Sequence, residues 1–302
     1  MVDRIATFLQ STSLAQDLTR LQTQYAKGEE QESSGLVSQN YQGIATSTQR
    51  LLNLESQYST LANQSENAQT ALDRVNSMTN AVQSMEDLVT SFTSTLSAAI
   101  STTGNSSSSD LSSSASQVLQ QFASLLNTEQ AGRYLFGGGV TDKAPVDLSD
   151  PNYTAPTVPS SSNTAYYQGD SRIASVQASD NLTVSYGVTA DDSSFEKALR
   201  ALNLVANNPS DQSALTEAYN LLSNANDGLA AMHSSLATKA STLDTQINDN
   251  ADDLNLLDNM IGDIKNVDIS SLSVKLSQLE TQLEASYSLT SSILKLNLAN
   301  YL

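Results

Sequence analysis

The sequence predicts a mainly α-helical protein in which both chain ends form a long antiparallel helical coiled-coil or bundle rod, with a small β-rich tip domain inserted. Two runs of apolar residues spaced alternately by three and four predict the long helices, at residues 51–96 and 215–264. Four of the five prolines fall between Pro145 and Pro159, so no helix is expected there. Residues 172–186 then alternate with the two-residue period of strands.

The first part of the chain carries a short heptad stripe and then a long one. Leu14, Leu18, Leu21 and Tyr25 form the short stripe. The long run at 51–96 keeps its apolar residues on one narrow face, which is the seam along which coiled-coil helices pack. Residues 102–109 are Gly, Asn, Ser and Thr with a predicted loop structure, and residues 111–129 are again predicted to be helical, with one apolar face.

The middle of the chain changes character at the three consecutive glycines 137–139, which end the helical part. Residues 172–178 and 182–186 alternate on either side of Ser179-Asp180-Asn181, which predicts a β-hairpin. Helix resumes at Phe195, after a cluster of capping residues at 191–194. A turn at 207–211 then precedes the second long run.

The second long run is interrupted only by Asn226, His233 and Asn250. We interpret all three as polar seam residues, which cost stability and fix the alignment of the helices. His233 is the only histidine, so no second imidazole can complete a histidine-based metal site. The aspartates at 249–253 lack the glycine and the spacing of a calcium loop and are interpreted as a solvated acidic face.

The two ends are predicted to expose more apolar surface than one partner helix can cover, which is typical of an interface. The candidate assembly residues are Leu14, Leu18, Leu21, Tyr25, Leu272, Leu276, Leu279, Leu283, Leu289, Ile293, Leu296, Tyr301 and Leu302. The expected organisation is terminal assembly helices (1–40 and 269–302), a long-helix bundle (41–136 and 195–268) and a β-rich outer tip domain (137–194).

Composition argues against several classes of function. The 302-residue chain has 14 Lys and Arg against 32 Asp and Glu, a net charge of -18, which disfavours nucleic acid and anionic membranes as partners. The absence of cysteine excludes thiolate metal sites and a cysteine nucleophile. The glycines at 137–139 with Lys143 lack the order of a phosphate loop. No nucleophile, base and oxyanion donor can be grouped, so we expect neither an enzyme nor a cofactor.

Several segments carry a resemblance to a known family. They are Ser33-Ser34-Gly35-Leu36, Gly132-Arg133-Tyr134-Leu135-Phe136-Gly137, the stretch 184–202, Val267-Asp268-Ile269, Glu284-Ala285-Ser286-Tyr287 and the final Asn300-Tyr301-Leu302. With the helix, insertion, helix layout, they resemble the flagellin superfamily of bacterial axial proteins, and within it the hook-filament junction branch, hook-associated protein type 3. Residues 37–42 depart from it, because the family commonly has a basic residue and a double-Asp segment there.

The resemblance implies a secreted, extracellular subunit of the bacterial flagellum, which joins a hook-associated ring to the flagellin filament by self-association of its terminal helices. It also implies export by the flagellar type III route without a cleaved signal. The implied partners are further copies in a ring, a neighbouring hook-associated protein, flagellin, and a cytoplasmic export chaperone on the C-terminal helix. We expect no nucleic acid partner and no membrane insertion.

Two further expectations accompany this interpretation. Arg133, Tyr134 and Phe136 are expected to join the helical arm to the tip, through cation–π or carboxylate contacts of the arginine. The alternative functions are a filament-forming flagellin, or a secreted helical adhesin or effector with a ligand-binding β tip.

Overall fold

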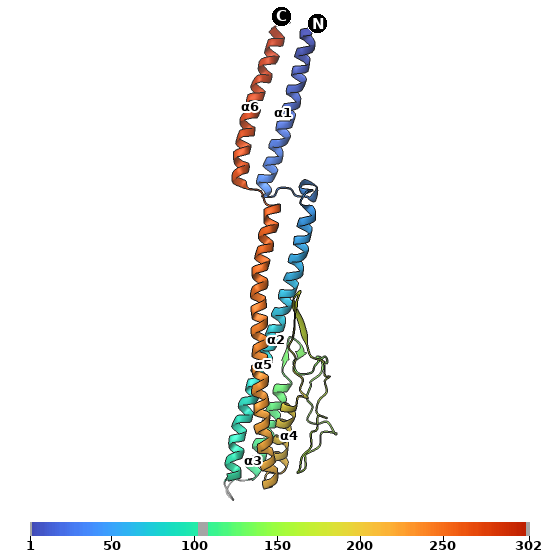
Figure 1. Ribbon diagram of the computed structural model, residues 1–302, viewed down its shortest axis with the longest axis vertical. Helices are drawn as coiled ribbons and strands as arrows, with labels where there is room; N and C mark the ends of the chain where they lie inside the picture. Colours follow the sequence, from blue (N-terminus) through green and yellow to red (C-terminus); the bar gives the residue numbers. More distant parts are fainter. Residues whose placement is uncertain (1, 102–107, 300–302) are drawn as a thin grey trace. The chain divides into compact units, whose positions relative to one another are not determined.

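The computed structural model describes residues 2–101 and 108–299, and it describes side chains for 12–101 and 108–292 (Figure 1). The fold is mainly α-helical with a small β part, as the sequence predicts. The helices are α1 (Val2–Ser34), η1 (Tyr41–Ile44, a 3-10 turn), α2 (Thr48–Ser101), α3 (Ser108–Leu126), α4 (Ser193–Asn207), α5 (Gln212–Lys265) and α6 (Ile269–Ala299). The predicted loop at 102–109 lies mostly outside the described residues.

The chain forms two compact units, one of residues 1–60 and 253–302 and one of residues 61–252. In the first unit, α1 and α6 lie side by side, with the leucine stripe of α6 buried and the stripe of α1 half-buried (Figure 1). Among the helices described, none contains an apolar stretch long enough to cross a bilayer.

In the same unit, two crossing segments link the terminal helices to the long ones. Gly35 ends α1 with a φ of 71°, a left-handed conformation that glycine adopts without strain. Val37 N donates to the Lys265 carbonyl at 2.8 Å, and Val267 N donates to the Gly35 carbonyl at 2.9 Å. The two crossings therefore satisfy each other's backbone groups as a short antiparallel bridge between Leu36 and Asn266.

The second unit is a helical bundle that carries irregular chain and two small hairpins. The stripe of α2 is buried from Ala68 to Leu96, and that of α5 is buried at Leu222, Leu229, Leu236 and Leu243. Both stripes pack with α3 and α4, whose own apolar faces are buried in one continuous core. Three rings mark its centre, because Phe195 makes edge-on contacts with Phe122 at 6.2 Å and with Phe136 at 5.8 Å.

The predicted hairpin is confirmed, with β3 (Ser175–Ser179) antiparallel to β4 (Leu182–Ser185). The predicted cap and turn are also found, since Asp192 caps α4 by accepting from Ser194 N, and Asp211 accepts from Ser213 N at the start of α5.

The end of α3 differs from the prediction, because the helix stops at Leu126 and not at residue 129. The Asn127 side chain exchanges two 2.9 Å hydrogen bonds with the backbone of Val146, which ties the chain to a different segment there. A hairpin that the sequence did not predict follows, with β1 (Glu129–Gln130) paired to β2 (Arg133–Tyr134). Its turn places Ala131 and Gly132 at φ values of 50° and 75°, as two-residue hairpin turns require.

Candidate functional site

The terminal helices bring eight of the candidate assembly residues together in a single chain. On α6, Leu272, Leu276, Leu279 and Leu283 are buried, with exposures between 6 and 9%. Their counterparts on α1, namely Leu14, Leu18, Leu21 and Tyr25, are half-buried. The stripes that the sequence predicts for assembly therefore cover each other within one chain, at least over this length.

Close approach of the two helices depends on Gly28, which continues the α1 stripe one step beyond Tyr25 and is buried. A Cβ at this position would lie 2.5 Å from Leu276 Cδ2, so the leucine rests directly on the α1 backbone. Polar contacts fix the register on either side of this point. Ser273 Oγ donates to Glu32 at 2.9 Å, and Gln22 Nε2 donates to the Tyr287 hydroxyl at 2.9 Å.

The negative charge along this pair acts on Tyr25. The neighbouring Glu29 carboxylate raises the pKa of the Tyr25 phenol above its ordinary value, with desolvation and then Glu280 of α6 adding to the effect. Glu29 and Glu280 therefore both lie near the phenol, one on each helix.

Beyond Leu283 the apolar residues of α6 leave the seam. The half-buried seam positions are Ser286 and Thr290, whereas Leu289 is 57% exposed. Val274 is 61% exposed, and Ile269 and Tyr287 are about half exposed. The side chains of Ile293 and Leu296, and all of Tyr301 and Leu302, lie outside the described residues. Among the described residues, α6 thus has exposed apolar side chains, Val274 and Leu289, that α1 does not cover.

The three candidate junction residues lie at the second hairpin strand and just after it. Phe136 is fully buried and contacts Phe195 of α4, while Tyr134 is half-buried. Arg133 is exposed, and its Nε donates to Thr141 Oγ1 at 3.3 Å. Within the described side chains, salt bridges join only Arg20 to Asp17, Arg200 to Glu196, and Lys265 to Glu55. The contact that ties this segment to the helices is therefore the phenylalanine, and the arginine bonds within its own segment.

Asn226 and Asn250, two of the three polar seam residues, have partners on other elements. Asn226 of α5 accepts a hydrogen bond from Thr90 of α2 at 3.1 Å. Asn250 is buried and donates to the carbonyl of Ala178 in β3 at 2.9 Å. His233 is half-buried, and no group of three His, Asp or Glu side chains in the described parts of the chain could hold a metal ion.

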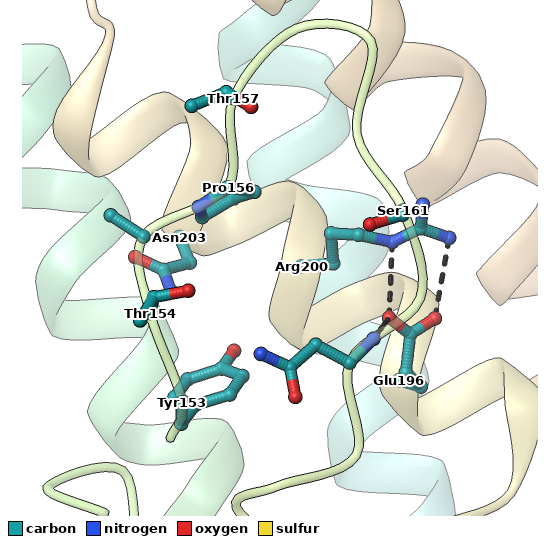
Figure 2. A pocket seen from close by; sticks show the side chains of 10 residues that line it. Tyr153, Thr154, Pro156, Thr157, Ser161, Glu196, Arg200 and Asn203 are labelled. Atoms are coloured by element: carbon teal, nitrogen blue, oxygen red, sulfur yellow. Dashed lines mark hydrogen bonds and ion pairs between the residues drawn. The ribbon is translucent and has the colours of Figure 1, made fainter. Parts of the chain in front are cut away.

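A cavity of about 190 Å³ lies between α4 and the irregular segment 153–163 (Figure 2). Figure 2 shows Glu196 and Arg200 of α4 facing each other on one wall, and their side chains are 4% and 14% exposed. Arg200 Nε lies 3.1 Å from Glu196 Oε1, and Nη1 donates to Ser160 Oγ at 3.1 Å. The charges of this wall are thus neutralised within the protein.

Hydrogen bonds to glutamates of α4 and α5 hold the segment 153–163 on the helical bundle. Ser160 donates to the Glu217 carboxylate of α5 through its backbone N, at 2.8 Å, and also through its hydroxyl. Asn163 N donates to Glu196 at 3.1 Å. The sequence does not predict this cluster of Glu196, Arg200 and Ser160. The i, i+4 spacing of Glu196 and Arg200 suggests a helix-surface ion pair, and nothing in the sequence indicates that a loop covers it.

Two tyrosines beside this loop have phenol pKa values well above the ordinary value. Burial raises the pKa of the Tyr166 phenol far above its ordinary value, and its hydroxyl donates to the Ala190 carbonyl at 2.9 Å. Burial also raises the pKa of Tyr167, which donates to the Asp170 carbonyl at 2.6 Å. Both phenols are therefore neutral hydrogen-bond donors, Tyr166 joining its segment to Ala190 and Tyr167 bonding within its own loop.

No protein-family model matches the sequence, and no curated protein matches it. Solved structures do share the fold. A protein from Vibrio parahaemolyticus, assigned as flagellar hook-associated, matches with a TM-score of 0.59 and 17% identity over 75% of this chain and 99% of its own. FlgL of Bacillus cereus matches with a TM-score of 0.56 and 15% identity, covering 69% of this chain and 98% of its own. The chain therefore has a fold that occurs among flagellar hook-associated proteins.

Proposed function

We propose that the protein is a non-enzymatic structural subunit of the bacterial flagellum, placed at the junction between the hook and the filament. The shared fold supports a flagellar hook-associated role. One of the two similar structures is assigned as a flagellar hook-associated protein, and the other is FlgL. The junction motifs of the sequence, above all Val267-Asp268-Ile269 and Glu284-Ala285-Ser286-Tyr287, support the finer placement.

The observation that carries the proposal is the pair of terminal helices. The stripe of α6 from Leu272 to Leu283 is buried within the chain. Val274 and Leu289 of the same helix remain exposed. Apolar side chains that stay exposed after the two helices have paired can be covered by a neighbouring subunit. The subunit would then join others, including a neighbouring hook-associated protein and flagellin, through the outer faces of this pair.

The same surface bears on export. We propose that the subunit leaves the cell unfolded by the flagellar type III route, and that a cytoplasmic chaperone covers α6 beforehand. The absence of cysteine means that no disulfide has to form outside the cell. Contacts between residues close in sequence, as in long helices, favour rapid refolding.

The test is electron microscopy of source cells from which the gene has been deleted. Hooks that lack filaments, restored by the full chain, are expected, because the filament would have no adaptor to grow from. Intact filaments in the deletion strain would reject the junction role. A chain that lacks residues 269–302 is expected to fail in complementation although residues 61–252 keep their helical signal in circular dichroism.

A further inference from the structure

Three of the seven arginines of this acidic chain line one hollow of about 230 Å³ in the second unit. Arg74 comes from α2, Arg133 from β2, and Arg172 from the segment before β3. None of the three takes part in the salt bridges of the described side chains. Arg74 and Arg133 instead bond to neutral groups, the Tyr186 hydroxyl at 3.4 Å and the Thr141 hydroxyl at 3.3 Å. We name this feature the arginine hollow.

The Asp170 carboxylate lies beside the hollow and offsets part of its charge. Asp170 Oδ1 accepts from Gly139 N at 2.6 Å and from Arg172 N at 3.0 Å. These backbone hydrogen bonds, first that of Gly139, lower the pKa of Asp170, and the charge of Arg172 adds a smaller effect. Asp170 is thus ionised and held by the backbone of its own loop, and its charge offsets one of the three arginine charges.

The opposite charge gathers on one face of α5. Asp249, Asp252 and Asp253 are exposed and spaced by three and four residues, and Asp263 follows 14 residues after Asp249. Such spacings place all four on the same side of a helix. Leu256, seven residues after Asp249, lies among them and is 58% exposed. None of the four aspartates is in a salt bridge of the described side chains. We name this feature the acidic face.

The two features match in more than charge. The arginine hollow contains an apolar side chain at its rim, Ile173, which is 48% exposed. The acidic face has Leu256 at its centre. An apolar contact ringed by complementary charges is the usual composition of a specific interface. Because the chain has a net charge of -18, two copies repel each other over most of their surfaces. The arginine hollow is a surface that attracts an acidic helix.

We infer that the arginine hollow is a docking surface for the acidic face of a second copy of this chain. The contact joins two different patches, so each copy offers both a donor and an acceptor surface. A heterologous contact of this kind generates rings or helical arrays, whereas a contact between like patches stops at a dimer. The inference rests on the proposed function, because it supplies the lateral contact between subunits of the ring.

The absence of native cysteine makes cross-linking the direct test. Ser171 is exposed beside Arg172, and Asn259 is exposed one heptad after Asp252. A chain with both Ser171→Cys and Asn259→Cys is expressed in the deletion strain, and flagella are treated with a short bismaleimide. The expected result is a ladder that extends beyond the dimer. Neither single variant should form it, and the pair Ser171→Cys with Ser223→Cys, elsewhere on α5, is the matched control.

Charge reversal tests the cause of the contact. Arg133→Glu with Arg172→Glu should lower the cross-linked fraction about tenfold or more, because like charges then face each other. Asp252→Lys with Asp263→Lys should do the same, and a chain with all four changes should recover the ladder. Arg50→Glu with Lys239→Glu changes the net charge equally outside the hollow and should leave the ladder intact. Circular dichroism and urea unfolding verify that each variant folds.

The outcomes separate the inference from the function on which it rests. Motile cells with filaments and no ladder from the double-cysteine chain would overturn the inference and leave the junction role standing. Dimers formed by a single-cysteine chain would overturn it too, because like patches would then meet. Intact filaments in the deletion strain would reject the junction role, whatever the cross-linking shows.

Discussion

The side-chain amide of Asn250 on α5 donates a 2.9 Å hydrogen bond to the main-chain carbonyl of Ala178 in β3, and both residues are buried. The other end of the amide is also satisfied, since its oxygen accepts from Gln246 at 2.9 Å. Across the hairpin, Gln64 of α2 donates to Asp180 at 2.8 Å. The β3–β4 hairpin is thus fastened to both long helices by side-chain amides.

Replacing Asn250 by leucine should loosen this hairpin. The Ala178 carbonyl would remain buried without a partner, which costs about 1–3 kcal/mol in the free energy of unfolding. Urea unfolding measures the loss, and hydrogen exchange should locate it in residues 175–185. Asn248→Ala is the control, because that amide is exposed and bonds only within α5, to the Asp244 carbonyl. Unchanged protection of the hairpin in Asn250→Leu would show that the bond does not hold it.

The heptad pattern was sufficient to predict the long helices, because packing of a narrow apolar stripe depends only on spacing within one segment. It predicted that Asn250 is a polar seam residue, yet its partner is a strand carbonyl 72 positions away, which no local pattern encodes. The β1–β2 hairpin was missed for a similar reason. Ala131 precedes Gly132 in its turn at positive φ, where sequence statistics favour asparagine or glycine.

The sequence predicted which residues of the terminal helices form apolar stripes, but not which of them face α1 and which stay exposed. The terminal helices were expected to pair and to expose more apolar surface than one partner helix can cover, and Leu276 and its neighbours are buried where α6 lies against α1. Gly28 could have been found from the sequence, since it continues the step from Leu21 to Tyr25 and a glycine in a seam allows close approach. The direction of Val274 and Leu289, away from α1, follows only from knowing which stripe α1 covers.

Gly28→Leu should separate α1 from α6 near Leu276. The new Cβ alone would lie 2.5 Å from Leu276 Cδ2, so the helices must shift or the leucine must repack. We expect a loss of about 1–3 kcal/mol, seen as faster hydrogen exchange in residues 20–32 and 272–284. Ala26→Leu places the same side chain at an exposed position and should change little. Adding Leu276→Ala to Gly28→Leu should restore part of the protection; failure to do so would place the clash elsewhere.

The buried pair of Glu196 and Arg200 should respond differently to single and double substitution. Arg200→Met leaves a carboxylate that is 4% exposed without its cation, which costs about 3–5 kcal/mol. Glu196→Leu with Arg200→Met removes both charges and should recover most of that loss. Urea unfolding of the two variants measures the difference. Equal stability of the single and double variants would mean that water reaches the Glu196 carboxylate.

Stability should fall at high pH, in part because of Tyr166. Its pKa in the folded protein is raised by burial, so the unfolded chain, with a phenol pKa near 10, releases the proton first. The stabilisation is therefore complete below about pH 10 and declines as the pH rises beyond that value. Urea midpoints between pH 8 and 11 measure the slope. Tyr166→Phe should reduce the slope and leave the part due to Tyr167, whereas Tyr41→Phe, at a position that is 49% exposed, should not change it.

The exposed and buried apolar residues of α6 should have separable effects. Val274→Ser with Leu289→Ser removes side chains that are 61% and 57% exposed, so the isolated protein should lose no more than about 0.5 kcal/mol. In the deletion strain, the same variant should fail to restore filaments, since the surface offered to neighbouring subunits is lost. Leu276→Ala should instead destabilise the purified protein by about 2–5 kcal/mol, because its side chain is buried against α1. Full motility with the double serine variant would show that neighbours do not use this face, and the terminal helices would then have to serve assembly by another surface.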